Sequence, residues 1–118
     1  MEELKGRIVV FAHDRHYPDP IRLKKGEEFT LSGRSVAWEG DEEHIWLWAV
    51  GRDGREGWVA NDFPQYRDGR IFAPFDYDSI ELSVVPGDEL QVMEEVLGWA
   101  RCKTLKGEEG WVPLRVFG

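Results

Sequence analysis

Hydrophobic and polar positions alternate with a period of two in several short stretches of the chain. Phe29 and Leu31 share one face of such a stretch, and Leu90 and Val92 share one face of another. These faces are expected to point into a core. No stretch of ten or more residues has a convincing helical period, and Gly and Pro punctuate the short segments. The pattern predicts an all-β protein.

One segment pattern occurs twice. Each copy has a Trp, then two Gly, then a Trp-Val pair, and the separations agree: Trp46, Gly54, Gly57, Trp58 and Val59 in the first half, and Trp99, Gly107, Gly110, Trp111 and Val112 in the second. The two Trp residues are 12 positions apart in both copies. Such self-similarity, at a period near 53 residues, indicates duplicated units.

The repeated segments predict two hairpins and their faces. Gly54 and Gly107 each lie in a four-residue turn, at 52–55 and 105–108, that is expected to join two strands. On the strands before these turns, small or aliphatic residues are expected to point inward, namely Leu47, Ala49, Ala100 and Cys102. The alternating tryptophans, Trp46, Trp48 and Trp99, are then expected to point outward.

The repeat predicts two domains, residues 1–65 and 70–118. Residues 64–69, with the sequence PQYRDG, are the expected seam, and so short a connection would keep the two units close. The first half has about eight more residues before its Trp strand. This insertion is interpreted as a long acidic loop.

The second half carries a series of motifs at consistent spacing. These are Ala73-Pro74-Phe75-Asp76-Tyr77, Glu81-Leu82-Ser83, Gly87-Asp88, Gly98-Trp99 and Gly110-Trp111-Val112-Pro113. In this order they resemble a Src-homology-3 (SH3) domain over almost the whole of residues 70–118. The first half resembles the variant SH3-like domains common in bacteria, with Tyr17-Pro18-Asp19-Pro20-Ile21 leading into Leu23-Lys24-Lys25-Gly26-Glu27, and with 57–63 closing the unit. Here Ala60 replaces the Pro, and the opening motif is reduced to Ala12, His13, Asp14 and Arg15.

The resemblance implies two tandem small barrels that bind peptides and catalyse nothing. SH3 domains take polyproline-II segments in a shallow aromatic groove. Matched residue by residue, the groove positions of the second half are Phe75, Tyr77, Trp99 and Pro113, and those of the first half are Tyr17, Trp46 and Phe63. The acids expected to select a basic peptide residue are Asp78, Glu81, Glu94 and Glu95, with Glu42 and Glu43 in the first half.

The second half departs from the family at two places. Val116 stands where the family has a second groove Tyr, and the loop between Tyr77 and Leu82 has four residues, which is short for a peptide-binding member. Two other interpretations therefore stay open. The barrels could be structural or regulatory, with their aromatic faces packed on each other or in a homodimer, or they could bind cell-wall peptide or glycan.

Composition narrows the expected partners. The net charge is −8, and an acidic surface repels phosphate, so we expect no nucleic-acid or membrane partner and instead a protein or peptide that is proline-rich or basic. The chain is expected to be a monomer or a homodimer. Its first residues lack a secretory pattern, and one cysteine, Cys102, excludes an internal disulfide, so a cytoplasmic location is expected.

Enzyme chemistry finds little support in the motifs. His13 and His16 lie three positions apart near Asp14 and Asp19, but no cysteine pair or third histidine accompanies them, and we expect no metal and no cofactor. His44 is interpreted as a surface residue. No phosphate-binding loop, nucleophile elbow or zinc-protease motif occurs.

Overall fold

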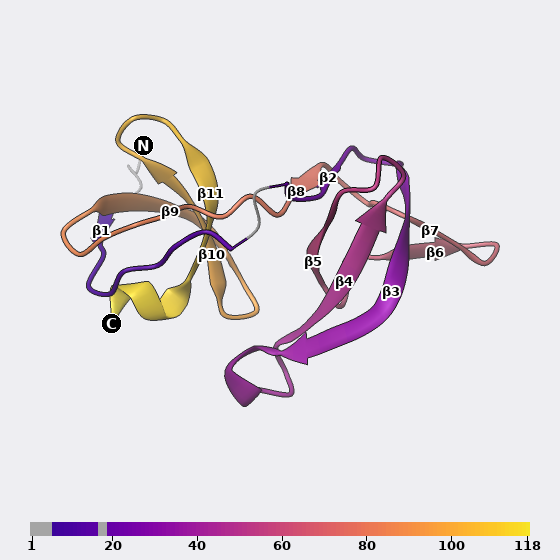
Figure 1. The fold of residues 1–118 in the computed structure, drawn as a ribbon, viewed down its shortest axis with the longest axis horizontal. Coiled ribbons are helices and arrows are strands. Elements are labelled where there is room, and N and C mark those ends of the chain that lie inside the picture. Colours follow the sequence, from indigo (N-terminus) through magenta and orange to yellow (C-terminus); the bar gives the residue numbers. More distant parts are fainter. Residues whose placement is uncertain (1–5, 17–18) are drawn as a thin grey trace, which may run out of the picture. The chain divides into compact units, whose positions relative to one another are not determined.

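The computed structural model describes residues 6–16 and 19–118, and they form strands and two short 3₁₀ helices. The predicted all-β class is confirmed (Figure 1). Among the described strands, neither main sheet closes on itself into a complete barrel. No helix in the described part of the chain is long and apolar enough to cross a membrane.

The described residues divide into two compact units, and one of them is discontinuous in sequence. We call unit 2 residues 19–79, and unit 1 the combination of residues 6–16 with residues 80–118. The chain therefore passes from one unit to the other twice, after His16 and after Ser79. These units differ from the continuous ranges 1–65 and 70–118 that the repeat suggested.

Unit 1 contains a four-stranded antiparallel sheet in the order β1-β9-β10-β11 (Figure 1). Its strands are β1 (Gly6–Ile8), β9 (Glu89–Val96), β10 (Trp99–Thr104) and β11 (Glu109–Pro113), followed by the 3₁₀ helix η2 (Leu114–Phe117). β1 lies at the edge, where Arg7 is paired with Leu90. The N-terminal strand thus completes a sheet whose other strands come from the last third of the chain.

The core of unit 1 combines residues from both of its segments. Val9, from the N-terminal segment, packs in one cluster with Leu82, Val84, Leu90, Ala100, Cys102, Val112 and Val116, all of them buried. Fully burying a side chain of this size contributes about 1.5–3 kcal/mol. Burial of Val9 therefore ties the N-terminal segment to this unit.

Unit 2 contains a five-stranded sheet in the order β5-β4-β3-β7-β6 and a two-stranded sheet, β2-β8 (Figure 1). The strands are β2 (Arg22–Leu23), β3 (Glu28–Ala37), β4 (Ile45–Gly51), β5 (Glu56–Ala60), β6 (Gln65–Arg67), β7 (Arg70–Phe72) and β8 (Tyr77–Asp78). The 3₁₀ helix η1 (Trp38–Gly40) lies between β3 and β4, within the predicted acidic insertion. The long β3 carries a register shift between Leu31 and Ser35.

Residues 65–67 and 70–72, at and after the predicted seam, form a hairpin that completes the sheet of unit 2. β6 pairs with β7, and β7 pairs with β3 through Phe29 and Ile71. The Arg70 guanidinium donates two hydrogen bonds to the Glu28 carboxylate, at 3.0 and 2.6 Å, and these bonds lower the pKa of Glu28. Main-chain pairing thus holds the segment after residue 64 inside unit 2.

The predicted hairpins are present in both units. Gly54 and Gly107 lie in their turns with φ of 86° and 90°, a region that glycine enters without steric cost. Gly110, in the repeated motif, has a different reason: a Cβ there would come within 2.9 Å of Leu82 Cγ and 3.0 Å of the Ile80 carbonyl oxygen. The repeated glycines therefore serve turn geometry and close strand packing.

Candidate functional site

The structure regroups the residues expected to form two grooves. Phe75 and Tyr77 were expected beside Trp99 and Pro113, but they belong to unit 2, whereas Trp99 and Pro113 belong to unit 1. The cause is the pairing of β8 with β2, in which Tyr77 is opposite Leu23. The structure therefore assigns the opening motif of the second half to unit 2.

Unit 2 brings together three aromatic rings, Phe63, Phe75 and Tyr77, which we call the aromatic cluster. The Phe63 ring centroid lies 5.2 Å from that of Phe75 and 5.0 Å from that of Tyr77. These separations are within the range of favourable aromatic pairs. Phe63 is buried, Tyr77 is half-buried, and the Phe75 side chain is 56% exposed. The cluster therefore presents an aromatic surface on a buried base.

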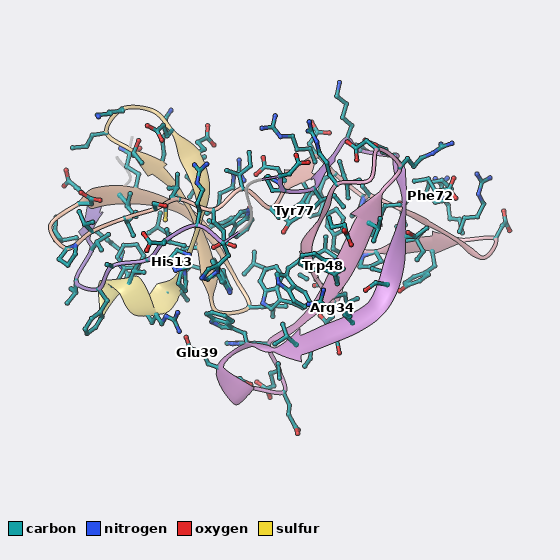
Figure 2. All side chains as sticks on the ribbon, viewed as in Figure 1. His13, Arg34, Glu39, Trp48, Phe72 and Tyr77 are labelled. Carbon is teal, nitrogen blue, oxygen red and sulfur yellow. The ribbon has the colours of Figure 1, made fainter. Side chains whose placement is uncertain are left out.

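The backbone and one hydroxyl hold this cluster in place. The Tyr77 hydroxyl donates a hydrogen bond to the Trp58 carbonyl oxygen on β5. The Asp76 carboxylate accepts a hydrogen bond from the Lys25 amide at 2.8 Å. Figure 2 labels Tyr77 on its strand. Two hydrogen bonds, one to Trp58 and one to Lys25, thus fix residues 75–77 within unit 2.

Trp46 and Trp48, which were expected to point outward, are both buried. Trp46 is 5% exposed and lies between Val36 of β3 and Ala60 of β5 in the strand register. Trp48 is 7% exposed, because the Trp58 ring packs edge-on against it at 4.8 Å and the Arg34 guanidinium lies 4.8 Å above its ring. Arg34 and Trp48 are labelled in Figure 2.

The residues predicted to point inward on the strands before the two repeated turns are buried or half-buried. Ala49, Ala100 and Cys102 are fully buried, as expected, and Leu47 is half-buried. Burial raises the pKa of the Cys102 thiol to about 11. Trp99 is half-buried and its ring lies 5.7 Å from that of His13, edge to face.

The expected specificity acids have different surroundings. Glu42, Glu43, Glu94 and Glu95 are exposed, and Asp78 is half-buried in β8. Glu81 was expected to be available to a ligand, but it is only 8% exposed and its Oε1 lies 2.8 Å from Nε2 of His13. Tyr17 lies outside the described residues.

Unit 1 has different side chains at the places that the aromatic cluster occupies in unit 2. His13 forms a bridge with Val84, as Tyr77 pairs with Leu23, and Val84 and Leu23 each stand three residues before a glycine. Val116 follows Val112 by four residues, as Phe63 follows Val59. His13 had a weak sequence signal, and its contact with Glu81, 68 residues away, had none.

Comparison with protein families agrees with this strand-built architecture. The model of the variant SH3 domain matches residues 8–63, and the model of the SH3 domain matches residues 73–114. No match was found among curated proteins or among solved structures. SH3 domains are non-catalytic interaction modules, so the fold and the matches define a protein-interaction module. The chain belongs to the SH3 family and carries a variant and a conventional SH3 domain in tandem.

Proposed function

We propose that unit 2 binds an extended, proline-containing peptide of a partner protein on the aromatic cluster. The observation that carries this proposal is the exposed Phe75 ring beside Phe63 and Tyr77, at centroid distances near 5 Å from Phe63. Proline rings pack well on aromatic faces, and a polyproline-II segment loses little conformational entropy on binding.

Charge supports a basic residue in the same peptide. Unit 2 exposes Glu42 and Glu43 after η1 and half-exposes Asp78 beside Tyr77. The chain as a whole has a net charge of −8. Exposed acids on the same unit attract Arg or Lys and speed association, and salt weakens this attraction.

A structural role without a peptide ligand is the second candidate. The low exposure of Trp46 favours it, since a binding Trp at that position would need an accessible indole face. The two functions differ in whether they require Phe75. A peptide site needs the exposed Phe75 ring, whereas a structural role in which Trp46 is packed does not depend on Phe75.

The test compares two exposed phenylalanines that stand two residues before Tyr77 and His13. Phe75→Ala should weaken binding of an Arg-containing proline-rich peptide by about tenfold, the equivalent of about 1.4 kcal/mol, because the peptide loses an aromatic face. Phe11→Ala is the matched control, since Phe11 is 59% exposed but lies in unit 1. Amide chemical shifts of the labelled full chain would report both affinity and location.

The outcomes separate the candidates. Saturable shifts around Phe63, Phe75 and Tyr77 that Phe75→Ala weakens and Phe11→Ala preserves support the proposal. Equal effects of the two variants, or no saturable shift with a panel of such peptides, contradict it.

A further inference from the structure

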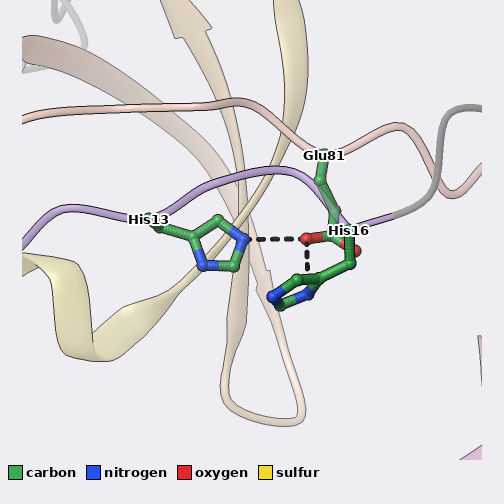
Figure 3. Close-up of side chains that lie close together, drawn as sticks. All are labelled: His13, His16 and Glu81. Carbon is green, nitrogen blue, oxygen red and sulfur yellow. Dashed lines mark hydrogen bonds and ion pairs between the residues drawn. The ribbon is translucent and has the colours of Figure 1, made fainter.

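Unit 1 gathers two imidazoles around one carboxylate, His13, His16 and Glu81 (Figure 3). Nε2 of His13 lies 2.8 Å from Oε1 of Glu81, and Nδ1 of His16 lies 3.5 Å from the same oxygen. One ligand atom from each residue falls within 4.8 Å of the others. We call these three residues the histidine–glutamate site.

We propose that the histidine–glutamate site binds a divalent transition-metal ion, with Zn²⁺ as the best match. Two imidazole nitrogens and one carboxylate oxygen are ligands that Zn²⁺ takes, at about 2.0–2.2 Å each. Ligand atoms at these bond lengths around a tetrahedral ion are about 3.3–3.5 Å apart. The His16–Glu81 separation of 3.5 Å already meets this spacing, and the ligand atoms of His13 and His16 lie within 4.8 Å of each other. Binding an ion therefore requires side-chain rotation: His13 moves away from Glu81 by about half an ångström, and the two imidazoles adjust to the same spacing.

Main-chain hydrogen bonds position the two buried ligands. The His13 amide donates to the Val84 carbonyl oxygen at 3.0 Å, and the Val84 amide donates back to His13 at 2.8 Å. Next to Glu81 in sequence, the Leu82 amide donates to the Trp111 carbonyl oxygen at 3.0 Å. Two residues from segments 68 positions apart are thus fixed with their side chains facing each other, as a preformed site requires.

Burial and charge favour a cation at this place. The side chains of His13 and Glu81 are only 3% and 9% exposed, whereas that of His16 is 55% exposed. A carboxylate removed from water is costly unless positive charge or hydrogen bonds compensate it. A bound divalent ion would supply that charge, and the exposed His16 side gives the ion a route of entry.

Three protein ligands leave one position of a tetrahedral ion for an outside group. Zinc sites with three protein ligands hold a water or another ligand in the fourth position. The Trp99 ring packs edge-on against His13 at 5.7 Å, so an aromatic side chain also lies beside this site. A donor group on a partner, such as a carboxylate or an imidazole, is the chemistry that this position would accept.

The test is a Zn²⁺ titration of the full chain by calorimetry, in wild type and two histidine variants. Wild type should bind one ion, and His16→Ala should weaken binding by more than about tenfold, because a direct ligand is lost. His44→Ala is the matched control: His44 also stands near a carboxylate, 3.6 Å from Asp41, but lies in unit 2. Its affinity for Zn²⁺ should stay within about twofold of wild type.

A second readout separates metal binding from a plain His–Glu ion pair. On Zn²⁺ addition, the side-chain ¹⁵N resonances of Nε2 of His13 and Nδ1 of His16 should both shift, and those of His44 should not. Because His16 is exposed, its variant is expected to keep the native amide spectrum, which checks folding. Unchanged Zn²⁺ affinity in His16→Ala, loss of binding in His44→Ala, or no binding at millimolar Zn²⁺ overturns the proposal.

Discussion

The two units place different chemistry at corresponding positions of one fold. In unit 2, Tyr77 of β8 pairs with Leu23 of β2, and the Phe63 ring centroid lies 5.0 Å from that of Tyr77. In unit 1 the same places hold His13 and Val116. A cluster of aromatic rings is therefore found in one unit, and an imidazole beside a carboxylate in the other.

A second difference accompanies the first. Glu81 stands three residues before Val84, and Pro20 stands three residues before Leu23. A carboxylate at this position in unit 2 would lie near Tyr77, which offers no positive charge. In unit 1 it meets His13. Unit 1 thus pairs an imidazole with a carboxylate where unit 2 has a phenol and a proline, so the two differences belong to one change of local chemistry.

The largest expected effect is the gain or loss of folding in fragments that contain different segments of a unit. A fragment of residues 17–79 should fold alone, because it contains β2 to β8 and the aromatic cluster. A fragment of residues 1–65 should not, since it lacks β7 and Tyr77. Amide dispersion and cooperative urea unfolding would measure both. A folded 1–65 beside an unfolded 17–79 would show that each half keeps its own N-terminal segment.

This division could not be read from sequence, although much else could. The strands and both hairpins followed from alternation and the Trp-Gly repeat, and the family followed from the resemblance of its motifs. Two opening segments of similar pattern, 8–13 and 72–77, compete for two similar positions, and local pattern does not state which segment occupies which unit. Val9 and Ala73 are both 1% exposed in these segments, so each position is filled by a small apolar side chain.

The burial of the Trp48 side chain and the histidine–glutamate site could not be predicted from the sequence, for related reasons. Alternation correctly placed Ala49 and Trp48 on opposite faces of the strand. It does not predict which side chains from other strands pack over each face. Arg34 and Trp58 come from neighbouring strands, and their packing over Trp48 depends on strand order. His13 and Glu81 are brought together only by pairing across 68 residues.

The next effect contrasts the two repeated tryptophans. Trp46→Ala should lower the free energy of unfolding by about 3–5 kcal/mol, as for other buried aromatic residues, because Trp46 is 5% exposed. Trp99→Ala should cost about half as much, since Trp99 is half-buried. Native-state hydrogen exchange, followed separately in β4 and β10, would give both values. Equal losses would remove the distinction between these positions.

The smallest effect exploits Cys102, whose counterpart 53 residues earlier is Ala49. Burial raises the pKa of the Cys102 thiol to about 11, above the ordinary value of about 8.5. The folded state therefore retains a proton that the unfolded state releases between these values. Unit 1 should keep this contribution below about pH 8.5 and lose up to about 2–3 kcal/mol as the pH rises towards 11.

Cys102→Ala makes this position of unit 1 match unit 2 and should remove that part of the pH dependence. The variant loses some packing at all pH values, so the informative quantity is the difference in unfolding free energy between wild type and variant, measured from pH 8 to 11. Other groups that titrate in this range cancel in the difference. A gap that narrows as the pH rises is expected, because wild type alone pays for ionising a buried thiol. A constant gap would mean that the thiol ionises as easily in the folded chain as in the unfolded one. Water would then reach Cys102 in the folded core of unit 1.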